Sequence, residues 1–162
     1  MFKDEVAKIA KKKSVFVSFD MDGVIAEYDV SKNESHKMRG GDFYSSKRPI
    51  KTIIGVMQNL SKIPNVEVGI LSCCHFVEQA EQKKIWLKAN CPFLKNENIH
   101  IICYEETDFD TRDKYSLKTQ LLEKLFSNAD VEVFHVDDDV RVIKDMAKSE
   151  RVVVKHISSL VE

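Results

Sequence analysis

Two carboxylates stand at the end of an apolar run near the beginning of the chain. Residues 15–19, VFVSF, are followed by Asp20, Met21, Asp22 and Gly23. A surface strand has little use for this ending, whereas a site that holds a cation against a phosphate group needs carboxylate oxygens close together. A glycine directly after the second acid lets the backbone turn sharply beside such a group. The segment therefore predicts a site of phosphate chemistry, provided that further groups join it.

Two other apolar runs end in polar side chains that could join this site. Ser72 follows the run 66–71, and Asp137 and Asp138 follow the run 131–136. Each acid alone is explained equally well as a turn or helix-cap residue, and we expect Asp139 to cap a helix that begins at Val140. In an open parallel sheet, however, ligands bind at the carboxyl ends of the strands. The three strand ends are therefore expected to converge.

Apolar runs of strand length alternate with segments of helical periodicity along the chain. Strands are expected at residues 14–19, 66–71, 99–104, 131–136 and 151–157. Helices are expected at residues 49–63, 75–90, around 117–125 and at 140–147, and a short amphipathic helix is expected at the N-terminus. This alternation predicts an α/β fold, a Rossmann-like three-layer α/β/α sandwich with a mainly parallel five-stranded sheet. We expect one domain over residues 1–162, with residues 27–48 as a small loop or cap insertion.

Composition excludes several classes of protein. A chain of 162 residues with 43% hydrophobic and 31% charged residues can build one sizeable core. The formal net charge of −1 gives no global sign of nucleic-acid or membrane binding, and no apolar stretch approaches a signal peptide or a membrane span. The four cysteines lack paired spacing, so we interpret them as reduced thiols of a cytoplasmic protein without a membrane partner. They are Cys73, Cys74, Cys91 and Cys103.

The order of these motifs resembles that of the haloacid dehalogenase-like (HAD) superfamily. FDMDGV, residues 19–24, fits its first motif, in which apolar residues precede Asp-x-Asp-Gly and then Thr or Val. GILS, which ends in Ser72, is similar to the second motif, and FHVDDD, residues 134–139, is similar to the fourth. The third motif, a lysine at the start of the helix before the fourth, is met by Lys118 or Lys114, and Lys118 is slightly preferred. The resemblance covers nearly the whole core and implies the HAD-like fold.

The resemblance also implies a catalytic role for each of these residues. Asp20 would attack phosphorus and form an aspartyl-phosphate intermediate. Asp22 would protonate the leaving-group oxygen and later deprotonate the attacking water. An Asp at this second position is the pattern of the phosphatase and phosphomutase members. Ser72 would donate its hydroxyl to a phosphoryl oxygen.

The implied cofactor is Mg²⁺, because every implied ligand is an oxygen atom. The direct ligands would be Asp20, the main-chain carbonyl of Asp22 and, by the family pattern, Asp138. Asp137 is expected to lie behind Asp138 and to support it.

The interval between residues 27 and 48 is polar, contains glycine and lacks clear periodicity. It is too short for a helical cap domain, so we expect no large cap. A minimal lid over an open site is expected, or a neighbouring subunit of a homo-oligomer that covers it. Six basic side chains suit a phosphorylated ligand, and they are Lys32, His36, Lys37, Arg39, Lys47 and Arg48.

The expected substrate is a phosphomonoester, either a small molecule or a phosphorylated nucleic-acid end. EQKKIWLKANCPFL, residues 81–94, together with TRDK, residues 111–114, resembles the 5'(3')-deoxyribonucleotidase branch and favours nucleotides. Two other functions stay open. One is a non-catalytic Rossmann-like domain that binds metal or phosphate, and the other is a phosphoryl transferase, which would normally need a closing cap to exclude water.

Overall fold

Five parallel strands form the centre of the structure. The computed structural model describes residues 1–28 and 40–160. The strands lie in the order β3-β2-β1-β4-β5, and all four neighbouring pairs are parallel. They are β1 (Ser14–Phe19), β2 (Val66–Cys74), β3 (Ile99–Cys103), β4 (Val131–Asp137) and β5 (Val152–His156). The predicted five-stranded parallel sheet is therefore confirmed.

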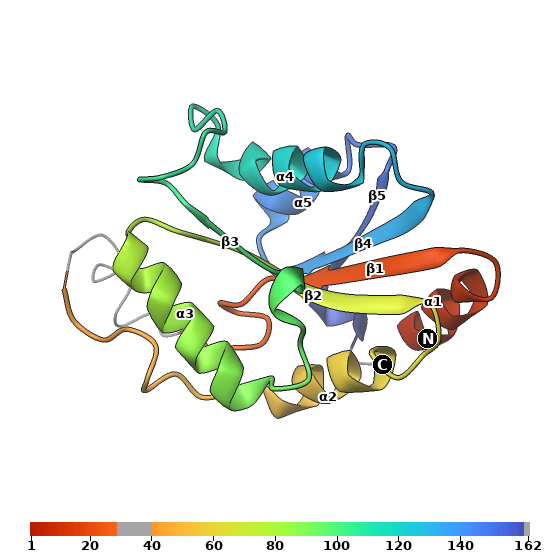
Figure 1. The fold of residues 1–162 in the computed structure, drawn as a ribbon, viewed down its shortest axis with the longest axis horizontal. Helices are drawn as coiled ribbons and strands as arrows, with labels where there is room; N and C mark the ends of the chain where they lie inside the picture. The colour runs from red at the N-terminus through yellow and green to blue at the C-terminus, as the bar shows by residue number, and fades with distance from the viewer. Residues whose placement is uncertain (29–39, 161–162) are drawn as a thin grey trace.

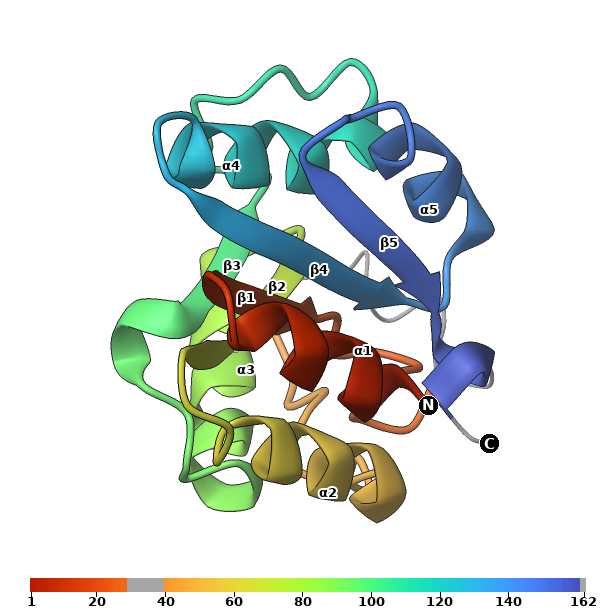
Figure 2. The ribbon, with the colours of Figure 1, turned by 90° about the vertical axis from the view of Figure 1, so that its right-hand side faces the viewer.

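Helices cover both faces of this sheet (Figures 1 and 2). The face shown lower in both views carries α1 (Phe2–Ala10), α2 (Lys51–Leu60) and α3 (Val77–Asn90). The opposite face carries α4 (Leu117–Phe126) and α5 (Val140–Met146). Short 3-10 turns are η3 (Asn96–Asn98), η4 (Lys114–Ser116) and η5 (Ile157–Leu160). The three-layer α/β/α sandwich is thus confirmed, and no helix of the described residues is long and apolar enough to cross a membrane.

Each face of the sheet has its own hydrophobic core. In β1, Val15, Val17 and Phe19 belong to the core beneath α1, α2 and α3, whereas Phe16 belongs to the core under α4 and α5. Five consecutive residues of β1 are buried, as expected for a central parallel strand that is covered on both faces. This double covering explains why the β1 sequence is a continuous β-branched and aromatic run.

The chain changes direction across the sheet between β1 and β4. From β1 it proceeds through β2 to β3, and then it crosses back to β4 and β5 on the other side. Ligands of open α/β sheets bind at this kind of switch point, outside the carboxyl ends of the strands. Phe19 of β1 is paired with Val136 of β4, so Asp20 and Asp137 leave the sheet at the same level.

The ends of β3, β4 and β5 differ from the sequence prediction by one residue, and the end of β2 differs by three. We expected β2 to end before Ser72, but the strand continues to Cys74 because β3 goes on pairing with it, with Ser72 opposite Ile101. On the other side, the last residue of β1 is opposite Ile70. Ser72 is therefore two residues beyond the last β1 pair, beside the turn that contains the paired acids.

The interval after β1 contains no helix or strand in its described parts, residues 20–28 and 40–50. Isolated bridges join Ala26 to Asp22 and to Pro49. These described parts of the interval form no large cap. Four of the six basic side chains predicted for the lid lie outside the described residues, namely Lys32, His36, Lys37 and Arg39.

Candidate active site

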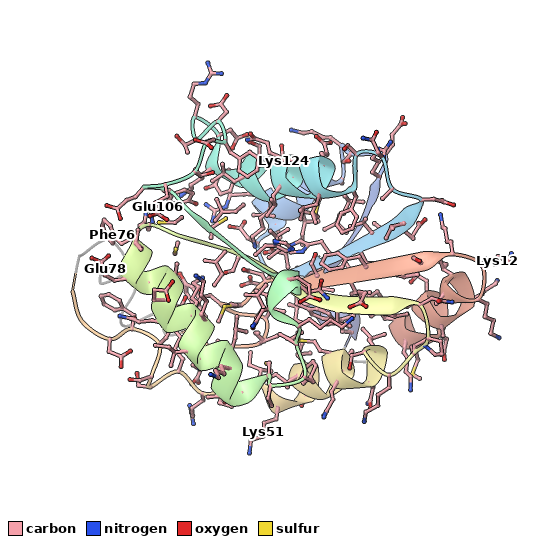
Figure 3. All side chains as sticks on the ribbon, in the orientation of Figure 1. Lys12, Lys51, Phe76, Glu78, Glu106 and Lys124 are labelled. Carbon is pink, nitrogen blue, oxygen red and sulfur yellow. The ribbon has the colours of Figure 1, made fainter. Side chains whose placement is uncertain are left out.

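The predicted site residues come together at the carboxyl ends of β1, β2 and β4. Figure 3 marks this end of the molecule by Phe76 and Glu78 at the beginning of α3 and by Glu106 just after β3. Lys12, which precedes β1, lies at the opposite end. A cavity of about 190 Å³ opens here, and Asp20, Asp22 and Ser72 are among the residues that line it.

The turn after β1 requires glycine at position 23. Gly23 has φ +81°, a conformation that residues with a side chain rarely adopt. A Cβ atom at this position would also overlap the carboxylate of Asp138, whose Cγ would be 2.7 Å away. The glycine therefore lets the β1 turn and the β4 end approach each other, which brings Asp138 next to the paired acids.

Three carboxylates meet at this junction. One oxygen each of Asp20, Asp137 and Asp138 lies within 4.8 Å of the others. Burial raises the pKa of Asp138 to about 6, and the negative charges of Asp20 and Asp137 add to this effect. Among the described residues, Asp138 forms no ion pair. Crowded carboxylates of this kind fit a hard divalent cation such as Mg²⁺.

Both carboxylate oxygens of Asp137 already contact protein groups. Asp137 is completely buried, its Oδ2 accepts a hydrogen bond from Lys118 Nζ at 2.6 Å, and its Oδ1 accepts one from the backbone N–H of Asp139 at 2.9 Å. His135 Nε2 lies 3.0 Å from the same Oδ2. Burial would raise the pKa of Asp137, but Lys118 and His135 outweigh it and hold this pKa below its usual range. Asp138 is thus the freer of the two acids.

His135 links this carboxylate to the middle of the sheet. Burial lowers the pKa of His135, so its imidazole is neutral near pH 7. Its Nε2–H then donates to Asp137, and its Nδ1 accepts a hydrogen bond from Ser18 Oγ at 2.8 Å. These buried contacts from Ser18 through His135 fix the orientation of the Asp137 side chain.

The structure distinguishes the two lysines that the sequence left open. The Lys118 side chain is only 6% exposed, and its Nζ lies 3.0 Å from Asp20 Oδ1 as well as beside Asp137. Burial would lower the pKa of Lys118, but the two carboxylates raise it above its usual value. Lys114 lines the cavity too, but it is exposed on η4 and lies over the Tyr115 ring at 5.2 Å. The structure therefore brings Lys118, and not Lys114, to the first acid.

Asp22 is surrounded by three donors: Lys47, which was among the basic residues predicted for the lid, and Tyr44 and Lys83, which the sequence analysis did not assign to the site. Its Oδ1 forms an ion pair with Lys47, and its Oδ2 accepts hydrogen bonds from Tyr44 Oη and, at 3.0 Å, from Lys83 Nζ. Burial would raise the pKa of Asp22, but Lys83 and Lys47 outweigh it and hold the pKa well below its usual range. In this structure Asp22 is therefore a carboxylate.

These donors are placed by the inward face of α3. Lys83 reaches the site itself, while Trp86 Nε1 donates to the carbonyl of Lys47 at 2.9 Å. Gln82 accepts from the backbone N–H of Phe43 at 3.0 Å and donates to the carbonyl of Gly41 at 2.7 Å. The helix thus holds the segment 41–47 over Asp22. The sequence did contain a signal for these inward polar side chains. Residues 77–90 form a helix that covers the sheet, yet they lack a clear apolar stripe, so some polar side chains must face the protein interior.

The two described basic residues of the predicted lid have different environments. Lys47 points into the site, whereas Arg48 is exposed and forms two hydrogen bonds with Glu27, both at 2.8 Å. Asp139, as predicted, caps α5, because its side chain accepts from the backbone N–H of Arg141 at 2.8 Å. The four cysteines are free thiols in the structure.

A second cavity adjoins the first and shares part of its lining. Its volume is about 280 Å³, and Asp22, Cys73, Tyr104 and Lys114 line both cavities. Its wall also carries ring side chains, which are Tyr28, Tyr44 and His75. The rings of His75 and Tyr104 contact each other with centroids 4.8 Å apart. The site therefore has a charged chamber and a neighbouring chamber with aromatic walls.

The acidic site lies at the switch point of a parallel α/β/α sandwich, and comparison with solved structures identifies this fold. No protein-family model matches the chain, and no curated protein sequence matches it. Solved structures do match, and they show that the chain has the HAD-like fold.

Three solved structures illustrate the match. The HAD domain of the effector protein Lem4 from Legionella pneumophila is 17% identical, with a TM-score of 0.52 over 89% of this chain and 86% of that one. A HAD-like phosphatase from Mesorhizobium loti is 7% identical, with a TM-score of 0.57 over 92% and 85%. A chain of the Pnkp1/Rnl/Hen1 complex is 19% identical, with a TM-score of 0.58 over 90% of this chain. The present chain spans 47% of that larger chain.

Proposed function

We propose that this protein is a Mg²⁺-dependent phosphomonoester hydrolase that acts through an aspartyl-phosphate on Asp20. The observation that carries the proposal is the arrangement around Asp20. A buried lysine, Lys118, lies 3.0 Å from this carboxylate, and Asp22 and Ser72 line the same cavity at the switch point of the sheet. The HAD-like neighbours support this class of reaction.

In the first step, an oxygen of Asp20 forms a bond to phosphorus while the bond to the leaving-group oxygen breaks and Asp22 gives that oxygen a proton. In the second step, a water oxygen attacks the phosphoryl group, Asp22 takes the proton from this water, and the bond from Asp20 to phosphorus breaks. Phosphate leaves and Asp20 is restored. Ser72 and Lys118 are suited to neutralise phosphoryl oxygens during both steps.

Asp22 as a carboxylate is in the form that the second step needs. For the first step it must carry a proton, although Lys83 and Lys47 lower its pKa in this structure. A phosphate dianion that binds beside Asp22 opposes this effect, because a nearby negative charge raises the pKa of a carboxyl group. Substrate binding therefore favours the protonated form when it is required.

Asp20, Asp138 and the main-chain carbonyl of Asp22 are the groups that would hold Mg²⁺. When bound, the ion would neutralise negative charge on the transferring phosphoryl group. Asp137 contributes differently, because its own contacts to Lys118 and His135 fix the position of the strand end that carries Asp138.

The second cavity supports a substrate with an aromatic leaving group, and a nucleoside is the biological group of this kind. Tyr28, Tyr44, His75 and Tyr104 line this cavity together with Asp22, the group that would protonate the leaving-group oxygen. Ring stacking against bases is tolerant of sequence. One structural neighbour belongs to an RNA repair complex. We therefore propose a nucleotide or a phosphorylated nucleic-acid end as the substrate. We also propose that the reaction takes place in the cytoplasm and that a second copy of the chain could cover the open site.

The experiment is a phosphatase screen of the purified protein with Mg²⁺ and with a chelator. The panel contains nucleotides, sugar phosphates, and oligonucleotides with a 3'- or 5'-phosphate. We expect Mg²⁺-dependent phosphate release, fastest with a nucleoside leaving group. Phosphate transfer to a second sugar or nucleoside instead of water would indicate a phosphoryl transferase. Binding of phosphate and metal without any turnover would indicate a non-catalytic domain.

A further inference from the structure

The ammonium group of Lys83 is buried between two strand ends that carry site residues. The side chain is 2% exposed, although it comes from the middle of α3. Its Nζ lies 2.7 Å from Ser72 Oγ, 2.9 Å from the carbonyl oxygen of Cys73 and 3.0 Å from Asp22 Oδ2. A fully buried lysine is rare unless it is paired, so this position has a specific cause.

These three contacts use the complete hydrogen-bonding capacity of the group. A lysine ammonium has three N–H donors and no acceptor. With three protein acceptors at hydrogen-bond distance, Lys83 has no donor left for a substrate. Its influence on chemistry must therefore pass through the groups that it holds, namely Ser72, Asp22 and the β2 backbone at Cys73.

The contact with Ser72 determines the direction of the serine hydroxyl. Because Lys83 donates to Ser72 Oγ, the oxygen acts as an acceptor on that side, and its own proton must point elsewhere. Among the residues that the structure describes, Ser72 donates this proton to no protein acceptor, and Ser72 lines the charged cavity. The hydroxyl proton is thus available to an oxygen atom inside that cavity.

We propose that Lys83 is a positioning residue that fixes the Ser72 hydroxyl as a phosphate donor and holds the Asp22 carboxylate beside it. The inference rests on the proposed phosphatase function and adds a second buried lysine to it. Lys118 links the ends of β1 and β4 through Asp20 and Asp137, and Lys83 links the ends of β1 and β2 through Asp22 and Ser72. The three strand ends are thereby fixed relative to one another.

The test compares Lys83→Met with Lys84→Met, its neighbour on the same helix. Lys84 is about half-exposed, and its ammonium pairs with Glu81, away from the site. Misplacement of a catalytic group by about 1 Å can cost roughly 10²-fold in rate, so we expect kcat of Lys83→Met to fall about 100-fold with a much smaller change in KM. Lys84→Met should stay within about twofold of the wild type, as is usual for a surface change.

A double-mutant cycle separates positioning from general support of the fold. If Lys83 acts through Ser72, then Lys83→Met should lower kcat by less than about tenfold in a Ser72→Ala background. Full multiplication of the two losses would overturn the inference. The inference would also fail if folded Lys83→Met kept the kcat of Lys84→Met. In both cases, activity of the wild type would leave the proposed function intact.

A second pair of variants covers the outcome in which Lys83→Met does not fold because the Asp22 charge is left buried. Asp22→Asn/Lys83→Met removes both charges together and is compared with Asp22→Asn alone. Binding of inorganic phosphate, measured by calorimetry with Mg²⁺, needs no turnover. We expect about tenfold weaker binding by the double variant, and equal binding would overturn the inference. A wild type without activity or phosphate binding would overturn both proposals.

Discussion

Replacement of Lys118 by methionine should destabilise the protein strongly, because the lysine is the buried counter-ion of two acids. Its Nζ lies 3.0 Å from Asp20 and 2.6 Å from Asp137, and Asp138 adds a third carboxylate within 4.8 Å of these. Methionine keeps the apolar stem and removes only the charge. Loss of one partner of a buried ion pair typically costs about 3–5 kcal/mol.

This magnitude is easily measured in a domain of this size. A change of 1 kcal/mol shifts Tm by roughly 2–4 °C, so Lys118→Met should unfold roughly 6–20 °C below the wild type in metal-free buffer at pH 7. Lys114→Met is the matched control, because Lys114 is exposed and its ammonium group lies over the Tyr115 ring. Its unfolding free energy should change by less than about 0.5 kcal/mol.

Thermal and urea unfolding, together with phosphatase assays, decide between the two lysines. We expect Lys118→Met to lose nearly all turnover as well as stability. The reasoning would be refuted if Lys114→Met lost more of both than Lys118→Met. It would equally be refuted if Lys118→Met were as stable as the wild type, since the three carboxylates would then need no counter-ion.

Two further substitutions test the junction between the β1 turn and the β4 end. Gly23→Ala should lower the free energy of unfolding by roughly 1–3 kcal/mol and weaken Mg²⁺-dependent activity, because the backbone is left-handed at this position and the new Cβ would overlap Asp138. The control is Gly55→Ala in α2, which has open space around it and should be neutral or stabilising. An equal loss of stability for both, measured by urea unfolding, would contradict this. Asp138 should also make the stability of the metal-free wild type depend on pH. Its pKa rises from the ordinary value of 3.8 to about 6 in the folded protein, so between these two pH values the folded state binds a proton that the unfolded state has lost. The free energy of unfolding should therefore fall as pH rises from 3.8 to about 6. Asp138→Asn should remove most of this pH dependence, raise the free energy of unfolding at pH 7 and reduce the rise in Tm on addition of Mg²⁺. A pH profile of stability identical to that of the wild type would argue against this placement of Asp138.

The elements of the fold were predictable because parallel strands and their helices have strong local patterns. β1 is buried on both faces and appears in the sequence as a continuous apolar run with the observed bounds, Ser14–Phe19. The end of β2 could not be predicted from its local sequence pattern. Its last residues, Ser72–Cys74, are strand because β3 pairs with them, and this register depends on a partner about 30 residues away.

The meeting of Asp20, Asp137 and Asp138 was also predictable, because each follows an apolar strand of a parallel sheet and the order of the motifs resembles that of the HAD superfamily. Of the two cations that contact Asp22, Lys47 was among the basic residues predicted for the lid, but Lys83 was not predicted. Lys83 is separated from Asp22 by 61 residues, and on a helix of mixed polarity it cannot be distinguished from the exposed Lys84 beside it. Only the packing of α3 against β2 shows which of the two lysines points inward.

The measurement that tests the central claim most directly is the search for phosphate covalently bound to Asp20. Wild-type protein would be mixed with Mg²⁺ and the best substrate of the screen, quenched in acid within milliseconds to seconds, digested and examined by mass spectrometry. We expect a phosphate adduct on the peptide that contains Asp20, which rises and then decays as substrate is consumed, and which is absent together with turnover in Asp20→Asn. Turnover without any adduct on Asp20, retained in Asp20→Asn, would contradict the proposed mechanism.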